Sequence, residues 1–197
     1  MIRNTTEGTS DMADIKVLVL LGSLRAASIN RQLAELAAES APDGVAVTIY
    51  EGLGELPFYN EDLETDAAPA AVAALRAAAA AADAALVVTP EYNGSIPGVL
   101  KNAIDVASRP YGKSSFLGKP TGIVGNSPGA LGGVAAVKHL QNILPGISGP
   151  ILGQPEIYLN GIGDAFNDKG ELVKEPVQKV LQQYLEAYAA FVEKWNG

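Results

Sequence analysis

The chain has 197 residues, 48% of them hydrophobic, which is enough to bury the core of one α/β domain. A formal net charge of −8 argues against nucleic-acid binding, which depends on clustered lysine and arginine side chains. The lack of cysteine and the single histidine exclude disulfides, a thiol nucleophile and the usual zinc sites.

Residues 1–14, MIRNTTEGTSDMAD, are polar and lack the apolar stretch of a signal peptide. We interpret them as a disordered N-terminal tail ahead of a single domain over residues 15–197. The sequence contains no run of about 18 apolar residues that could span a membrane. We therefore expect a cytoplasmic protein with no nucleic-acid or membrane partner.

The rest of the chain alternates between short apolar runs and longer helical patterns. The apolar runs predict strands over 15–21, 45–50, 84–89, 121–126 and 156–159. The intervening segments predict helices over 28–41, 69–82, 97–108, 130–144 and 174–195. Strands that alternate with helices at this spacing form a parallel sheet covered on both faces.

One stripe of side chains on the last helix predicts core packing rather than a binding site. It consists of Val177, Leu181, Tyr184, Leu185, Tyr188, Val192 and Trp195. In open α/β sheets, ligands bind beyond the carboxyl ends of the strands, so the loops after the strands carry the functional signal.

The loop after the first strand is GSLRAASIN, residues 22–30. Gly22 allows a tight turn, and the short polar side chains are those of Ser23, Ser28 and Asn30. Arg25 and the free N–H groups of the following helix suit a phosphate. Because a Walker lysine and the G-x-G-x-x-G pattern are both missing, a single terminal phosphate fits better than a triphosphate or dinucleotide. The alternative is that Ser28 only caps the helix.

The loop after the third strand, TPEYNGSIPG, is dense in hydrogen-bonding groups beside one aromatic ring. Such an edge suits a planar heteroaromatic ring, which needs backbone N–H and C=O groups for its heteroatoms. An ordinary Asn-Gly turn at Asn93 is the alternative. Together with the first loop, this one favours a mononucleotide that carries a ring system.

The loop after the fourth strand contains GNSPG, which matches the G-x-S-x-G nucleophile elbow of hydrolases. A Ser-His-acid triad needs a histidine from a distant later loop, whereas His139 lies just downstream on the predicted helix. We therefore interpret Ser127 and the glycines after it, including Gly129, as a thin polar wall against a ring. His139 is expected at a helix surface or an interface.

The motifs of this sequence resemble those of a known family, the NAD(P)H-dependent FMN reductases of flavodoxin-like fold. This family includes bacterial chromate, quinone and azo reductases. The resemblance rests on GSLRAASIN, LPFYNEDLE (56–64), TPEYNGSIPGVLKNAIDVASRP (89–110) and GKPTGIVGNSPGALGG (118–133). It covers essentially the whole chain after the tail. It implies a three-layer αβα sandwich around a parallel five-stranded sheet in the order 2-1-3-4-5.

The resemblance also implies which residues bind FMN. Those around its phosphate are Ser23, Arg25, Ser28, Ile29 and Asn30, and those bordering the isoalloxazine are Pro90, Glu91, Tyr92, Asn93, Ser127 and Gly129. The electron acceptor or nicotinamide would contact Tyr92, Asn93 and Arg109, although Arg109 could equally form an interface salt bridge. The sequence departs from many relatives at Ala26 and Ala27, where those carry a lysine or a glycine.

The implied activity is that of an FMN-dependent NAD(P)H oxidoreductase. NADPH or NADH would pass a hydride to N5 of FMN, and a small-molecule acceptor such as a quinone, azo dye or chromate would then be reduced in a ping-pong cycle. No protein side chain is expected to act as a catalyst, and no metal is expected. Relatives form homodimers or homotetramers. The alternatives are a flavodoxin-type electron carrier, a flavin reductase that releases reduced FMN, and a non-catalytic nucleotide-binding module.

Overall fold

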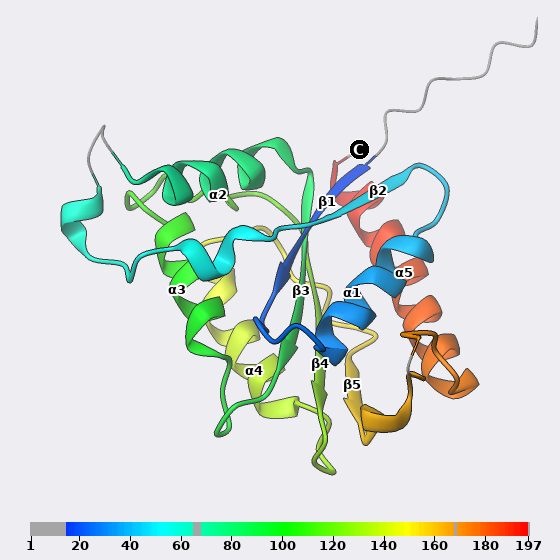
Figure 1. Cartoon of the computed structure of the whole chain (residues 1–197). Helices are drawn as coiled ribbons and strands as arrows, with labels where there is room; N and C mark the ends of the chain where they lie inside the picture. The colour runs from blue at the N-terminus through cyan, green and yellow to red at the C-terminus, as the bar shows by residue number, and fades with distance from the viewer. Residues whose placement is uncertain (1–14, 65–67, 168, 197) are drawn as a thin grey trace, which may run out of the picture.

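The structure is a computed structural model that describes residues 15–64, 68–167 and 169–196. The predicted disordered tail, residues 1–14, lies outside the described residues. Within them, the chain folds as an open parallel sheet with helices on both sides (Figure 1).

The sheet has five parallel strands in the order β2-β1-β3-β4-β5, as the resemblance implied. The strands are β1 (Ile15–Leu21), β2 (Val45–Ile49), β3 (Ala84–Pro90), β4 (Thr121–Ser127) and β5 (Ile157–Asn160). Every residue of β3 is buried, as expected of a central strand covered on both faces.

Five α-helices connect or follow the strands, each close to a predicted segment. They are α1 (Ile29–Glu39), α2 (Ala70–Ala81), α3 (Gly98–Ala107), α4 (Val134–Ile143) and α5 (Glu175–Asn196). Short 3-10 turns at Gly52–Glu55, Glu61–Leu63, Leu144–Gly146 and Ile162–Asp164 were not predicted.

The fourth helix begins four residues later than predicted because two glycines precede it in the left-handed region. Gly132 has φ +59° and Gly133 has φ +87°. A Cβ on Gly133 would lie 2.8 Å from the backbone nitrogen of Asn126, so only glycine fits this close approach.

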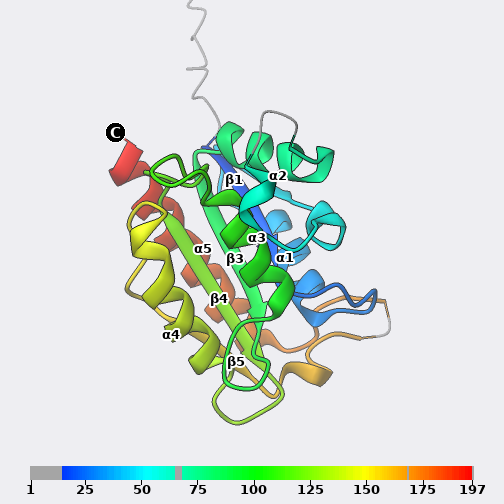
Figure 2. The ribbon, with the colours of Figure 1, turned by 90° about the vertical axis from the view of Figure 1, so that its left-hand side faces the viewer.

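The helices form two layers, and the sheet lies between them (Figures 1 and 2). Alternate residues of β1 face opposite layers: Leu18 and Leu20 pack in the core beneath α2, α3 and α4, whereas Val19 packs beneath α1 and α5. The three-layer αβα architecture is thereby confirmed. The predicted apolar stripe of α5 supplies much of the core beneath α1 and α5. Its last member, Trp195, is 53% exposed and lies outside that core.

Because all strands are parallel, their carboxyl ends lie along one edge of the sheet, at the lower end of Figure 1. From β1 the chain crosses to β2 on one side, and from β2 it returns to β3 on the other. The crevice between β1 and β3 is therefore the point where strand order reverses, the usual place for a ligand. In the part of the chain that the structure describes, no helix is long and apolar enough to cross a membrane.

Candidate functional site

A pocket of about 390 Å³ opens at the carboxyl edge of the sheet, a volume within the usual range of small-molecule sites. Residues that end or follow four of the five strands line it. They are Ser23, Arg25, Ser28, Ile29, Asn30, Pro90, Tyr92, Asn126, Pro128, Ile162 and Gly163. All five residues that the resemblance placed around a phosphate are thus brought together at one site.

The start of α1 supplies the anion-binding groups of the pocket. Its first backbone hydrogen bond runs from Gln32 N to Ser28 O (3.2 Å), so the amides of residues 29–31 have no acceptor within the helix. Ser28 occupies the N-cap position with extended backbone, yet its side chain makes no capping hydrogen bond. Its buried hydroxyl lines the pocket instead. This favours the binding role over the capping role.

Arg25 is the one cation among the lining residues, and it is exposed. Among the described residues it takes part in none of the ion pairs, which join other lysines and arginines to carboxylates. Its guanidinium is therefore available to a ligand. A guanidinium group beside the unpaired amides at the start of a helix is an arrangement suited to phosphate oxygens.

The floor of the pocket is an amide pair. Nδ2 of Asn126 donates hydrogen bonds to Oδ1 of Asn30 and to the backbone oxygen of Thr89, the latter at 3.3 Å. Asn30 and Asn126 are both buried. One side chain from β4 thus links the first turn of α1 to the end of β3.

The loop after β3 carries a tight hairpin. Tyr92 N donates to Ser95 O (2.9 Å) and Ser95 N donates to Tyr92 O (3.1 Å). Asn93 and Gly94 between them have φ of +52° and +72°, the signature of a type I′ turn. The Asn-Gly turn, the alternative interpretation of this loop, is therefore present, and it holds Tyr92 at the pocket. Tyr92 is the one aromatic side chain among the lining residues, and it is 54% exposed.

Two of the predicted ring neighbours in this loop do not line the pocket. The Glu91 carboxylate accepts hydrogen bonds from the backbone amides of Ala135 (2.9 Å) and Ala136 (3.3 Å), which belong to the first turn of α4. Asn93 is exposed at the tip of the hairpin. Glu91 therefore caps a helix in this structure, and the contact of Glu91 and Asn93 with a bound ring stays a prediction.

Ser127 and Gly129 flank the lining residue Pro128 without lining the pocket themselves. The Ser127 hydroxyl accepts a hydrogen bond from Gly129 N (3.1 Å), which closes the turn after β4. His139 is half-buried and pairs with Ser95 rather than with Ser127, the two atoms Nδ1 and Oγ lying 2.6 Å apart. The one histidine of the chain therefore does not serve as a base for Ser127. Binding of a ring by Ser127 and Gly129 stays a prediction.

Arg109 lies away from the pocket. It follows α3, a ten-residue helix that starts at the carboxyl edge of the sheet and runs about 15 Å toward the opposite edge. Its guanidinium carbon lies 5.6 Å from the centre of the Tyr59 ring, and its Nε lies 3.9 Å from Oε1 of Glu64. A single chain does not bring Arg109 to the pocket, and its contact with substrate stays a prediction.

Sequence reasoning missed four lining residues. Asn126 and Pro128 alternate along the chain with Ser127 and Gly129, the two residues predicted there. Side chains alternate in direction along a strand, and β4 continues to Ser127, so a longer predicted strand would have indicated Asn126 and Pro128. Ile162 and Gly163 follow β5 in a 3-10 turn, and the glycines at 161 and 163 are the signal that could have found them.

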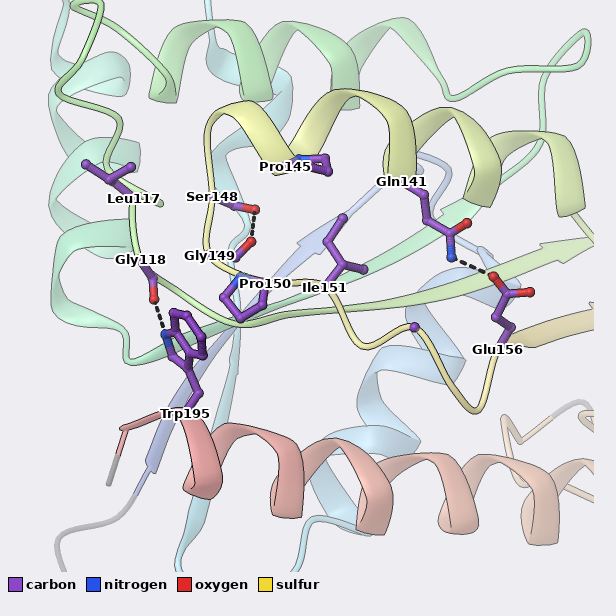
Figure 3. Close-up of a pocket in the computed structure, with 11 residues that line it drawn as sticks. Leu117, Gly118, Gln141, Pro145, Ser148, Gly149, Pro150, Ile151, Glu156 and Trp195 are labelled. Atoms are coloured by element: carbon purple, nitrogen blue, oxygen red, sulfur yellow. Dashed lines mark hydrogen bonds between the residues drawn. The ribbon is translucent and has the colours of Figure 1, made fainter.

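A larger cavity of about 680 Å³ lies at the opposite edge of the sheet (Figure 3). Its walls are Leu117, Pro145, Pro150, Ile151 and the indole of Trp195, whose Nε1 donates to the backbone oxygen of Gly118 (2.8 Å). At one end, the Glu156 carboxylate already accepts a hydrogen bond from Gln141 (2.7 Å). This cavity lacks an uncommitted charged group and is not the candidate site. The described residues contain no cluster of carboxylate or histidine side chains that could hold a metal ion.

Comparison with known proteins identifies the family of the chain. The sequence model of the family "NADPH-dependent FMN reductase" matches residues 15–164. The chain is 45% identical over 177 residues to a quinone reductase of Pseudomonas putida, covering 90% of this chain and 94% of that protein. It is 41% identical over 178 residues to a 2-hydroxy-1,4-benzoquinone reductase of a Burkholderia species, covering 90% and 96%.

Among solved structures, the flavoenzyme NAD(P)H:(acceptor) oxidoreductase FerB of Paracoccus denitrificans superposes with a TM-score of 0.83 at 38% identity, over 91% of this chain and 97% of that one. The family model covers all four motifs completely and most of the chain. The strand order, the position of the pocket and these likenesses lead to one conclusion. This chain belongs to the NADPH-dependent FMN reductase family.

Proposed function

We propose that the protein is an FMN-containing NAD(P)H oxidoreductase that reduces quinones. The observation that carries the proposal is the pocket at the carboxyl edge of the sheet. There, an uncommitted arginine, a serine hydroxyl without a capping bond and the start of a helix lie at one site with a single aromatic side chain. These groups fit FMN, a ring system with one terminal phosphate.

In this proposal the start of α1, with Arg25 and Ser28, holds the phosphate. Pro90, Tyr92, Asn126 and Pro128 border the ring, because these residues lie on the β3 and β4 sides of the pocket. When bound, FMN supplies the redox chemistry, accepting a hydride from NADPH or NADH and passing the reducing equivalents to the acceptor in a ping-pong cycle.

The chain's own residues would position the cofactor and leave one side of its ring accessible to substrates. Since Tyr92 is the one aromatic lining residue, an aromatic side chain covers a bound ring on no more than one side. The other side is accessible to a nicotinamide and then to an acceptor. This arrangement favours an enzyme over an electron carrier, which usually clamps its flavin between aromatic side chains.

The quinone acceptor is inferred from relatives named quinone reductase and 2-hydroxy-1,4-benzoquinone reductase. Chromate and azo dyes belong in the same acceptor panel. We also propose that the protein is cytoplasmic and forms a homodimer or homotetramer. Light scattering after size-exclusion chromatography measures its molar mass and so distinguishes the two assemblies.

The test mixes the FMN-loaded protein anaerobically with NADPH and, separately, with NADH. We expect rapid bleaching of the flavin absorbance, recovery of colour on addition of benzoquinone, and parallel double-reciprocal lines in steady state. A flavin that does not bleach would identify an electron carrier. A protein that takes up no FMN would identify a nucleotide-binding module, and reduced FMN appearing in an ultrafiltrate would identify a flavin reductase.

A further inference from the structure

Two side chains fasten the loop after β3 to helix α4. At one end of the loop, the Glu91 carboxylate accepts hydrogen bonds from the amides of Ala135 and Ala136. Four residues later, Ser95 Oγ lies 2.6 Å from Nδ1 of His139. In Figures 1 and 2, this loop and the start of α4 lie together at the lower end of the molecule.

The segment between these two contacts is the Tyr92–Ser95 hairpin, which brings Tyr92 to the pocket. Its own hydrogen bonds are the two backbone bonds between Tyr92 and Ser95. Tyr92, Asn93 and Gly94 are all exposed, so little buried surface within the hairpin fixes its direction. The orientation of Tyr92 therefore depends on the anchors on either side of it.

His139 suits the role of the second anchor. It is half-buried on α4, one helical turn after the amides that Glu91 caps. A hydroxyl both donates and accepts, so the hydrogen bond to Ser95 forms with either tautomer of the imidazole. The flanking α4 residues Ala136, Val137 and Leu140 are buried in the core, so the helix that carries His139 is held in place.

We infer that His139 is a positioning residue for the cofactor site: through Ser95 it holds the hairpin that places Tyr92 against the bound ring. The inference rests on the proposal that Tyr92 borders the flavin. It assigns the one histidine of the chain to orientation of the site rather than to proton transfer or hydrolysis.

The test compares FMN binding by the apoprotein of four variants, measured by quenching of flavin fluorescence. His139→Leu and Ser95→Ala each remove the hydrogen bond, and we expect each to weaken binding about two- to tenfold. His139→Asn places an amide atom where Nδ1 stood and should restore most of the affinity. The control is Asn142→Ala, an exposed position on the same helix, which should leave the affinity unchanged.

A double variant, Ser95→Ala with His139→Leu, separates one shared interaction from two independent ones. We expect its loss of affinity to be close to that of either single variant rather than their product. Additive losses, or an Asn variant as weak as the Leu variant, would overturn the inference.

Amide hydrogen exchange of the apoprotein gives a readout that does not need FMN. Loss of the anchor should speed exchange of the Tyr92 and Ser95 amides while the β1 amides keep their protection. Unchanged exchange at these two amides would overturn the inference. If the wild-type apoprotein fails to bind FMN, the proposed function fails, and the exchange experiment still decides whether His139 holds the hairpin.

Discussion

The side chains of Asn126 and Asn30 meet inside the molecule, where Nδ2 of Asn126 donates a hydrogen bond to Oδ1 of Asn30. They are 96 residues apart in sequence and only 4% and 5% exposed. The same Nδ2 donates to the backbone oxygen of Thr89. One buried amide on β4 thus ties the start of α1 to the end of β3, and the pocket forms there.

Asn126→Leu should therefore destabilise the protein even without a ligand. The Asn30 amide and the Thr89 carbonyl would lose a partner while buried, and we expect the free energy of unfolding to fall by about 1–3 kcal/mol. Urea unfolding of the apoprotein measures this. In the double variant with Asn30→Leu, the second substitution should cost less than it does alone, since no amide is left stranded at position 30. Fully additive losses would contradict a direct pairing.

Ser28→Ala distinguishes a binding hydroxyl from a capping hydroxyl. Loss of an N-cap side chain typically costs about 1 kcal/mol of stability, but Ser28 makes no capping hydrogen bond here. We expect the urea midpoint of the apoprotein to stay the same and the affinity for FMN to fall several-fold. A loss of stability with unchanged FMN affinity would return Ser28 to the capping role.

Arg25→Gln should weaken binding of the phosphate selectively. We expect the affinity for FMN to fall by about tenfold, as for loss of one charge-assisted hydrogen bond, with little change in the affinity for riboflavin, which lacks the phosphate. Fluorescence titration with both flavins measures the contrast. Lys179→Gln, at an exposed position of α5, is the matched control for loss of one positive charge. Equal losses for the two flavins would place Arg25 at the ring instead.

Gly22→Ala tests why glycine ends the first strand. The sequence suggested a tight turn, yet Gly22 is not among the glycines with positive φ. Instead, a Cβ there would lie 2.8 Å from Oγ1 of Thr89 and 3.1 Å from Cδ of Pro90. We expect the alanine variant to lose about 1–3 kcal/mol of unfolding free energy through overpacking. Gly98→Ala, where a Cβ meets open space, is the control and should not destabilise the protein.

The fold could be predicted almost completely because its strands are mainly apolar runs between helical patterns. β1 has the predicted bounds, and the other strands differ by a residue or two. The start of α4 was missed because the left-handed conformation of Gly132 and Gly133 depends on the packing of β4 and β5 beside them. Trp195 was misplaced because helical spacing continues to the end of α5, whereas the core does not.

The site was predicted best where local sequence determines its geometry. The loop after β1 leads directly into a helix, so its five predicted residues all line the pocket. After β3 and β4 the backbone turns sharply, and side-chain direction then depends on contacts with α4 that sequence does not reveal. Glu91 turns to the amides of Ala135 and Ala136 for this reason, and Asn126 rather than Ser127 points to the pocket.

Glu156 lies on the far side of the molecule from the pocket. Its carboxylate accepts hydrogen bonds from the ammonium of Lys138, the hydroxyl of Tyr158 (2.5 Å) and the amide of Gln141 (2.7 Å). The bond from Lys138 is the main cause that lowers the pKa of Glu156 from 4.5 to about 2. The glutamate side chain is 20% exposed, whereas that of Lys138 is 54% exposed, so solvent screens part of the interaction.

A carboxyl whose pKa is lowered on folding stabilises the protein fully above its unfolded pKa and loses that effect as the pH falls toward its folded pKa. Glu156→Gln should therefore lower the free energy of unfolding by about 1–2 kcal/mol at pH 7, after allowance for screening. The difference from wild type should shrink as the pH falls from about 4.5 toward about 2. Thermal unfolding at a series of pH values measures it, with Glu193→Gln, an exposed position of α5, as the control. A difference that stays constant down to pH ~3 would show that the substitution acts through packing rather than through the charge of Glu156.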